Sequence, residues 1–233
     1  MIESLGYRKI CARWVPRLLT ADNKVQRKAI TSEMLRRYRD EGDDFLLSIV
    51  TGDETWFHHF DPETKRQSME WHHLDSPTKK KPKTVASAKK IMGTVFWDSE
   101  GCILIEFLEP GTTINASHYV QTLSKLRRAL RDKCPGRKVI LQHDNARPHT
   151  ARLTLEKIEK MGWEVLPHPP YSPDLAPSDY HFFDFVKSQM RGKHYETNEA
   201  HQAAETEFYR KGIFKLPEWW EKCVQRNGDC VEK

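Results

Sequence analysis

The 233-residue sequence lacks the cysteine pattern and the short motifs that mark several common kinds of site. It contains no Gly-x-Ser-x-Gly, no His-Glu-x-x-His and no phosphate-cradling glycine loop. The number of cysteines is odd and none forms a Cys-x-x-Cys pair, so neither a zinc site nor a disulfide framework is expected. Reduced thiols are instead typical of a nuclear or cytosolic protein. The cysteines are Cys11, Cys102, Cys134, Cys223 and Cys230.

Long hydrophobic runs are also missing. No stretch approaches the ~18 apolar residues of a membrane span, and the start, Met1-Ile-Glu-Ser4, does not resemble a signal peptide. We therefore expect no membrane partner. Hydrophobic residues make up 38% and charged residues 30%, which is ordinary globular composition. The net charge of +5 is compatible with a polyanionic partner, and the length suits one sizeable domain or a domain with an appendage.

The order of the expected elements indicates an α/β fold. Apolar runs predict strands at 45–50, 69–73, 91–97, 102–108, 139–142 and 163–166. Helical patterns occupy about 22–40, 117–133, 151–161, 179–191, 198–211 and 216–226. Strands that are hairpin-linked first and helix-linked later favour a mixed sheet flanked by helices. This order is typical of an RNase H-like fold.

The first predicted helix combines an apolar stripe with a basic face. We expect the stripe to face the core and the basic residues to face solvent. The stripe consists of Val25, Ala29, Ile30, Met34 and Leu35, and the basic face of Lys24, Arg27, Lys28, Arg36, Arg37 and Arg39.

An extended basic insertion interrupts the fold at about residues 61–90. Its centre, Ser76 to Lys83, has no core-forming pattern and carries Lys79, Lys80, Lys81 and Lys83. A charge run is usually only a solvated face, but an exposed arm of lysines also suits contacts to backbone phosphates.

Three aspartates have the placement of a metal site. Asp53 and Asp144 follow strand-like runs, and Asp179 opens a helix-like run. Each alone could end a strand or cap a helix. In a sheet of this order, however, the first and fourth strands are neighbours, so Asp53 and Asp144 would project side by side, and the helix start could bring Asp179 across them. Such carboxylates suit Mg²⁺ or Mn²⁺, and two such ions can drive in-line attack on a phosphodiester.

Other polar residues near these aspartates have competing interpretations. Asp174, held between prolines, is expected to be a turn residue. Glu54 should point away from Asp53, because successive side chains alternate along a strand. His143 could orient a carboxylate or touch a phosphate, although a structural histidine is the commoner case. Arg147 lies three residues after Asp144 and suits a phosphate contact.

The sequence segments around these aspartates resemble those of the mariner transposases. The resemblance covers nearly the whole chain and includes Trp14-Val-Pro-Arg-Leu-Leu19, Gly52-Asp-Glu-Thr-Trp56, His143-Asp-Asn-Ala-Arg-Pro-His149 and Pro167 to His181. It implies an RNase H-like catalytic domain for cut-and-paste DNA transposition, with Asp53, Asp144 and Asp179 as ligands of two Mg²⁺ or Mn²⁺ ions. Members of the family cut at terminal inverted repeats and join the freed 3′-hydroxyl to a TA dinucleotide.

The resemblance also implies a domain layout and a set of partners. Residues 1–20 would be the remnant of a linker and 21–233 the catalytic domain, with no helix-turn-helix DNA-binding domain ahead of them. The expected partners are double-stranded DNA and a second copy of the chain, in the nucleus. Trp14, Val15 and Pro16 would make dimer contacts, although the sequence departs from the family's Trp-Val-Pro-His-Glu-Leu at Arg17 and Leu18.

Two other functions stay open at this stage. A stand-alone RNase H-like nuclease would cut DNA without joining a 3′ end to a TA target. A catalytically inactive, host-adapted DNA-binding protein would lack metal-dependent cleavage, and the intact set of three aspartates argues against it.

The lysine arm generates a prediction about salt. If its four lysines neutralise phosphates, log K for duplex DNA should fall against log[salt] with a slope of roughly −3 to −4. Replacing Lys79, Lys80, Lys81 and Lys83 by Ala should flatten that slope and weaken all DNA sequences alike. Titrations at several salt concentrations, with terminal-repeat and scrambled duplexes, measure both effects. An unchanged slope would remove the arm from the DNA-binding surface.

Overall fold

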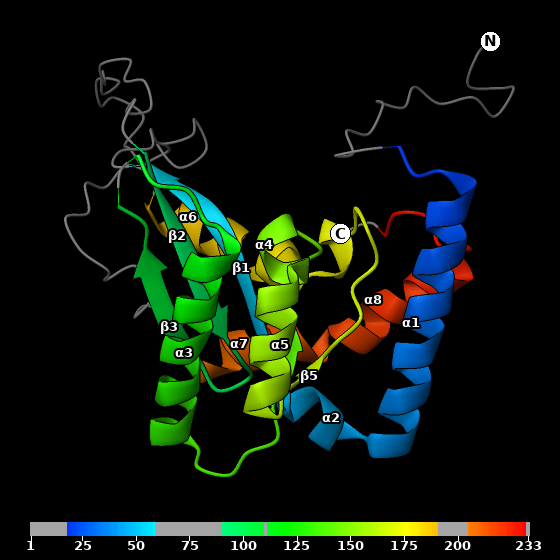
Figure 1. Cartoon of the computed structure of the whole chain (residues 1–233). Coiled ribbons are helices and arrows are strands. Elements are labelled where there is room, and N and C mark those ends of the chain that lie inside the picture. Colours follow the sequence, from blue (N-terminus) through cyan, green and yellow to red (C-terminus); the bar gives the residue numbers. More distant parts are fainter. Residues whose placement is uncertain (1–17, 59–89, 110, 191–204, 232–233) are drawn as a thin grey trace, which may run out of the picture.

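The computed structural model describes residues 18–58, 90–109, 111–190 and 205–231 (Figure 1). The predicted strand at 69–73, most of the basic insertion and residues 1–17 lie outside this part. The strands are β1 (Ile49–His58), β2 (Lys90–Trp97), β3 (Cys102–Phe107), β4 (Ile140–Gln142) and β5 (Glu164–Val165). The helices are α1 (Ala21–Glu41), α2 (Asp43–Leu47), α3 (Ala116–Lys133), α4 (Arg147–Thr150), α5 (Arg152–Met161), α6 (Phe183–Met190), α7 (Thr206–Phe214) and α8 (Leu216–Gln225), with a 3-10 turn η2 (Pro173–Leu175) and a π-helical turn η3 (Ser178–Phe182).

The described strands form one mixed five-stranded sheet in the order β3-β2-β1-β4-β5. The predicted strands at 91–97 and 102–108 pair as an antiparallel hairpin, β2 with β3, and β2 also pairs antiparallel with β1. β4 then lies parallel to β1, and β5 parallel to β4. The predicted neighbourhood of the first and fourth strands is therefore correct.

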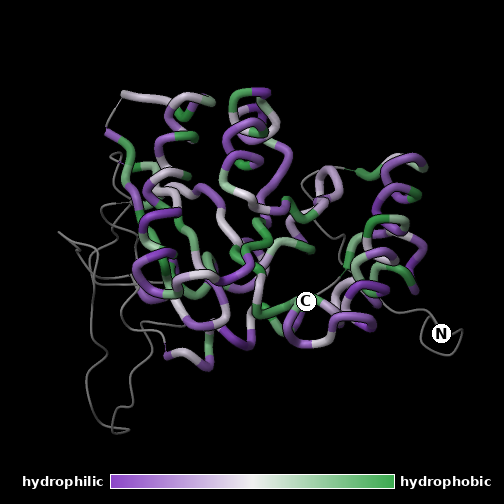
Figure 2. The backbone as a smooth tube through the Cα atoms, turned by 60° about the horizontal axis from the view of Figure 1, so that its bottom comes forward, coloured by the Kyte–Doolittle hydropathy of each residue, from purple (hydrophilic) through white to green (hydrophobic). Residues whose placement is uncertain are grey.

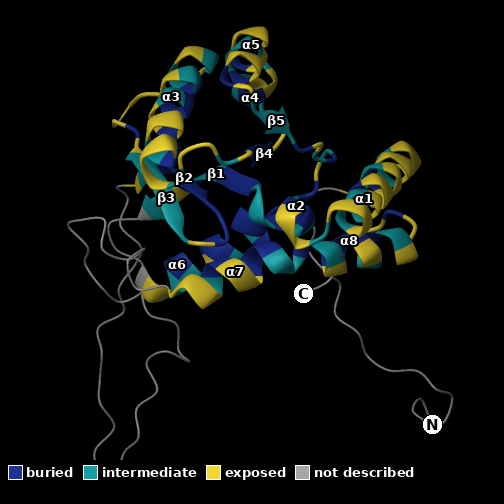
Figure 3. Ribbon diagram, turned by 90° about the horizontal axis from the view of Figure 1, so that it is seen from below, coloured by how far each residue is buried: buried dark blue, intermediate teal, exposed yellow. Residues whose placement is uncertain are grey.

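Helices cover both faces of this sheet (Figure 3), as the sequence predicted. Neighbouring residues of a strand point to opposite faces, so Ile49 and Val50 enter different cores. On one face, Val50, Phe96 and Leu141 pack against α3 and α5. The larger core on the other face joins Ile49 and Trp97 to residues of α1, α2, α6, α7 and α8. Hydrophobic stretches accordingly run through the middle of the molecule (Figure 2).

The strand predicted at 45–50 is wrong over its first half. Residues Asp43–Leu47 form the short helix α2, and the strand begins only at Ile49. A short apolar run fits a buried helix as well as a strand. The residues ahead of the run decide the outcome, because Gly42 at φ 65° ends α1 and acidic Asp43 and Asp44 favour a new helix N-terminus.

The inward face of α1 also differs from the prediction. Thr20 caps the helix through a reciprocal bond pair with Asn23. Val25 is 69% exposed, whereas Arg27 on the supposed basic face is fully buried. The segment packed against α1 explains why Arg27 points inward. This segment is the chain's C-terminal turn, and it offers oxygen acceptors to Arg27.

Arg27 is the centre of a buried polar clasp. Its guanidinium donates to both carboxylate oxygens of Asp174, at 2.9 and 2.7 Å, and its Nε donates to the carbonyl of Gly228 at 2.8 Å. The Val231 N–H donates to the same carboxylate at 2.7 Å. Asp174, expected to be a turn residue, thus also ties α1 and the C-terminal segment to the loop that leads into η3.

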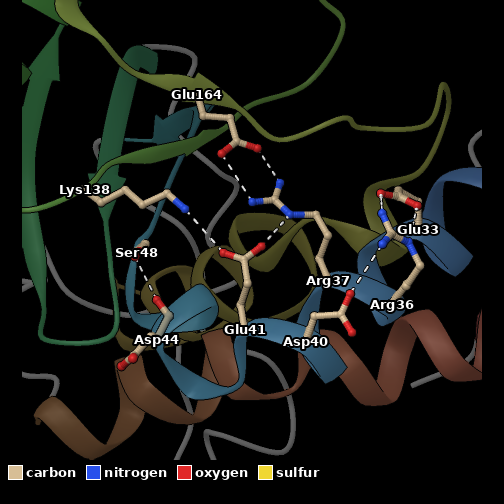
Figure 4. A network of polar contacts seen from close by, with 9 residues as sticks. All are labelled: Glu33, Arg36, Arg37, Asp40, Glu41, Asp44, Ser48, Lys138 and Glu164. Atoms are coloured by element: carbon tan, nitrogen blue, oxygen red, sulfur yellow. Dashed lines mark hydrogen bonds and ion pairs between the residues drawn. The ribbon is translucent and has the colours of Figure 1, made fainter.

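A second polar network joins the C-terminal half of α1 to the sheet (Figure 4). Arg37 forms ion pairs with Glu41, one turn along α1, and with Glu164 of β5. Lys138, just before β4, also reaches Glu41, at 3.3 Å. Side chains from α1 therefore contact the edge of the sheet where β4 and β5 begin.

The described helices include none with the length and apolar character of a membrane span.

Replacing Arg27 tests the clasp. Arg27→Met should lower the free energy of unfolding by about 3–5 kcal/mol, because it leaves Asp174 as an unpaired charge in a mostly buried site. Arg36→Met is the matched control on the same helix, since the ion pair of Arg36 with Glu33 is exposed and should cost little. Urea denaturation of both variants measures the difference. Equal midpoints would show that the clasp does not stabilise the fold.

Candidate active site

The strand pairing places Asp53 and Asp144 at the same level. Ile49 of β1 is paired with Ile140 of β4, and each aspartate lies four residues further along its chain (53 − 49 and 144 − 140). Parallel strands lie about 4.8 Å apart, so the two acids are neighbours, Asp53 inside β1 and Asp144 just after the end of β4. Gly52 allows β1 to lie close to the Phe96 ring at this level, because a Cβ at residue 52 would lie 2.2 Å from that ring.

Asp179 enters from the face covered by α6 and α7. It lies in η3, a π-helical turn, a conformation that is rare and frequent at functional sites. The turn is fixed from both sides. The indole of Trp97 donates to Ser178 Oγ at 3.1 Å, and the Tyr180 hydroxyl donates to the carbonyl of Gly212 at 2.7 Å. The third predicted acid is thus carried by a rigid, packed segment.

Asp53 experiences the charges of the other acids. Burial, together with the negative charges of Asp179, Glu54 and Asp144, raises the pKa of Asp53 to about 8. The N–H of Glu54, which donates to Asp53 Oδ1 at 2.7 Å, opposes this shift only in part. A carboxyl group in this position stores unfavourable electrostatic energy that a cation would relieve.

Asp144 is held by a histidine. His149 Nδ1 lies 2.7 Å from Asp144 Oδ1, and the N–H of Ala146 donates to the same oxygen at 2.9 Å. Burial acts to raise the pKa of Asp144, but these two bonds outweigh it and lower the pKa. For His149 the balance is similar, since burial acts to lower its pKa, yet Asp144 and Glu54 raise it to about 10. His149 is therefore a cation at neutral pH.

His143 is buried and does not lie open to a phosphate. The ring is 5% exposed and its Nδ1 lies 2.8 Å from the Tyr119 hydroxyl. Burial, with the nearby charge of His149, lowers its pKa to about 3. A neutral, buried ring has little surface for a phosphate, and it is the ring of His149 that contacts the carboxylate of Asp144. The sequence signal was present, since His149 closes the same His-Asp-Asn-Ala-Arg-Pro-His word.

The loops that carry Asp144 and Asp179 are fastened to each other. Asn145, directly after Asp144, donates through its side chain to the carbonyl of His168 at 2.8 Å. The amide of Gln142 reaches the ring of the same histidine at 3.3 Å. His168 lies in the proline-rich stretch that continues through Asp174 to η3, so this stretch links the end of β4 to the third acid. No pattern in the sequence predicts these contacts.

The remaining predicted residues divide into two groups. Arg147 opens α4, close to Asp144, and is exposed. Its position is compatible with a phosphate contact. The other predicted contacts lie outside the described residues: Lys79, Lys80, Lys81, Lys83, Trp14, Val15 and Pro16.

The three aspartates are chemically suited to bind divalent ions, but their side chains are not arranged around a common metal position. Within the described ranges, no group of three or more Asp, Glu, His or Cys side chains is placed to hold a metal ion. Oδ1 of Asp53 and Oδ1 of Asp144 both accept bonds from the protein instead. Hard carboxylate oxygens and mutual repulsion around Asp53 nevertheless match what Mg²⁺ or Mn²⁺ needs. The three-aspartate site therefore stays a prediction.

A mixed sheet of this order, with acids after neighbouring parallel strands and in a helical turn beside them, has the RNase H-like architecture of transposase catalytic domains. The comparisons with known proteins agree. Residues 61–140 match the family described as "Transposase (partial DDE domain)". The catalytic domain of Mos1 mariner transposase superposes with a TM-score of 0.77 at 39% identity, covering 94% of this chain and 100% of that chain.

Longer relatives define the family. Mariner Mos1 transposase of Drosophila mauritiana is 39% identical over 244 residues, covering 99% of this chain and 69% of that protein. A paired-end complex of Mos1 with the left transposon end matches with a TM-score of 0.85 over 99% of this chain and 70% of that chain. The human histone-lysine N-methyltransferase SETMAR is 37% identical over 97% of this chain, which spans only 34% of that protein. The chain belongs to the mariner transposases.

The charge at Asp53 generates a prediction about stability and pH. Its pKa is raised in the folded chain, so the folded state binds the extra proton and stability falls as pH rises from about 4 to about 8. Without metal, Asp53→Asn should therefore be more stable than the wild type by roughly 1–3 kcal/mol at pH 7 and nearly equal to it at pH 4.

Thermal melts in EDTA at both pH values, repeated with Mn²⁺, measure this effect. Mn²⁺ should raise the melting temperature of the wild type more than that of the variant, because only the wild type keeps the carboxylate. A variant that is less stable than the wild type in EDTA at pH 7 would contradict the electrostatic description of the site.

Proposed function

We propose that this chain is the catalytic core of a mariner transposase that cuts DNA at terminal inverted repeats and joins the freed 3′ ends to TA target sites. The observation that carries the proposal is the placement of Asp53, Asp144 and Asp179 on β1, after β4 and in η3 of an RNase H-like sheet. Residues 21–233 would be the catalytic domain, with an insertion arm at about 61–90, and residues 1–20 a linker.

The three aspartates would hold two divalent cations, Mg²⁺ or Mn²⁺. Relatives support the choice of ion, since the solved structures include the Mos1 paired-end complex with Mn and with Mg. Two bound ions would supply the Lewis acidity that activates the attacking oxygen and stabilises the leaving 3′-oxygen. No covalent bond between protein and DNA is needed, because water in cleavage and the 3′-hydroxyl in joining act at the same site.

The chain's own residues would orient the reaction. Two donors, His149 and the Ala146 N–H, restrain Oδ1 of Asp144, and the packed π-helical turn fixes Asp179. Arg147, exposed beside Asp144, would contact a backbone phosphate and set the position of the scissile strand. The lysine arm would add contacts that do not depend on sequence.

The partners follow from the same proposal. Mos1 structures include a paired-end complex and a Strand Transfer Complex, so we propose double-stranded transposon DNA, TA target DNA and a second copy of the chain as partners. Trp14, Val15 and Pro16 would contribute to the dimer. Because the substrate is chromosomal DNA, the protein would act in the nucleus.

Cleavage and joining assays test the proposal. Duplexes ending in the inverted repeat, with Mg²⁺ or Mn²⁺, should be nicked, and pre-cleaved ends should join to TA-containing DNA. Asp144→Asn should reduce both rates by more than ~100-fold, since even an outer partner of a metal ligand is worth 10–100-fold. Asp132→Asn is the matched control. It removes a carboxylate on α3 whose side chain is 64% exposed.

The outcomes separate the possible functions. Joining at TA sites supports the transposase, whereas cleavage without joining would favour a stand-alone nuclease. Strong cleavage in excess EDTA, or equal rates for the wild type and Asp144→Asn, would refute the metal-dependent mechanism.

A further inference from the structure

His149 connects two acids from different parts of the sheet, Glu54 on β1 and Asp144 just after β4. Its Nδ1 lies 2.7 Å from Asp144 Oδ1, and its Nε2 lies 3.4 Å from Glu54 Oε2. Glu54 points away from Asp53, as predicted from the alternation of β1, toward the face covered by α3 and α4. The imidazole is therefore the physical link between the candidate site and a carboxylate behind it.

The His149 ring is immobilised by its neighbours. Its side chain is 1% exposed. The ring stacks on His143, with centroids 5.0 Å apart and planes 6° apart, and lies 4.1 Å from the Tyr119 ring. The hydroxyl of Thr154 on α5 donates to the Pro148 carbonyl, which fixes the backbone just before His149. A ring confined in this way can hold a carboxylate in one orientation.

The contact with Glu54 is electrostatic. His149 Nε2 is buried and has no partner with hydrogen-bond geometry, so at 3.4 Å the carboxylate contributes charge without a directed bond. Thr94 Oγ1 lies 3.5 Å from Glu54 Oε1 and steadies its other oxygen. The Glu54 side chain is 15% exposed, so water screens its charge only weakly.

We infer that His149, backed by Glu54, is a positioning residue for Asp144 and thereby for the metal site. The Glu54–His149–Asp144 chain holds Oδ1 of Asp144, which leaves the orientation of the carboxylate fixed before any cation arrives. This inference rests on the proposed function. Because Glu54 points away from Asp53, its direction along β1 alone would exclude it from the site. The inference gives it an indirect role through His149.

A histidine that merely fills the core would have different consequences. Its replacement would then lower stability without changing metal affinity beyond what other destabilising changes cause. A positioning residue instead changes the affinity of Asp144 for the cation, by about 10–100-fold when an outer partner of a ligand is lost. Metal affinity measured apart from catalysis separates the two roles.

The experiment measures Mn²⁺ binding to the purified chain without DNA, by calorimetry or from the electron paramagnetic resonance of free Mn²⁺. His149→Phe keeps a stacked ring and removes both nitrogens, so the affinity should fall about 10-fold or more. His149→Gln, whose amide can still donate to Asp144, should recover most of that loss. Thr31→Val is the matched control, since it removes a buried hydrogen bond, from the Thr31 hydroxyl to the Arg27 carbonyl on α1, without touching His149 or Asp144.

Glu54→Gln tests the other end of the chain and serves if His149→Phe does not fold. It removes the charge behind the ring but leaves the His149–Asp144 bond, so Mn²⁺ affinity should fall in the same direction and by less. Circular dichroism melts of every variant show how much stability each one loses.

A double-mutant cycle decides whether His149 acts through Asp144. In an Asp144→Asn background, His149→Phe should change Mn²⁺ affinity by less than about twofold. Equal affinities of the wild type, His149→Phe and Thr31→Val, or a full effect that persists in Asp144→Asn, would overturn the inference. A wild type that binds Mn²⁺ but does not process DNA would sink the proposed function alone, and one that binds no Mn²⁺ would sink both.

Discussion

The parallel pairing of β1 with β4 is the contact on which the candidate site depends. It joins residues about ninety positions apart, Ile49 to Ile140 and Thr51 to Gln142, and it alone brings Asp53 beside Asp144. Parallel strands need a long crossover, which here contains β2, β3 and α3, and these elements also supply much of the core beneath the site. Losing the pairing would separate the acids and open both cores together.

This arrangement concentrates negative charge, and the surrounding structure compensates for it unequally. Asp144 receives a cationic histidine, and Asp174 receives the buried guanidinium of Arg27. Asp53 has only a backbone N–H, and its pKa rises accordingly. The structural acid is therefore satisfied within the fold, whereas the candidate ligand keeps its electrostatic cost until a cation binds. Such strain is expected where function, not stability, determines the residue.

Much of the fold could be predicted because its signals are local. Asp98 to Gly101 between two apolar runs specifies the hairpin, and the strand ahead of Asp144 follows from Val139 to Gln142. The errors came from long-range packing in one case and from a competing local signal in another. Arg27 looks like a surface residue until the C-terminal turn offers it oxygen acceptors, and Phe45 belongs to a helix because Gly42 and two acids precede it. The bridging role of His149 was equally hidden, since it requires knowing that Glu54 faces α4.

The central claim is that Asp53, Asp144 and Asp179 form one metal site, and anomalous X-ray scattering from crystals of this chain soaked in Mn²⁺ tests it most directly. The account predicts anomalous peaks lying between these three carboxylates, with Asp144 still bonded to His149. Peaks elsewhere, or ordered carboxylates around a site without manganese at saturating concentration, would contradict it.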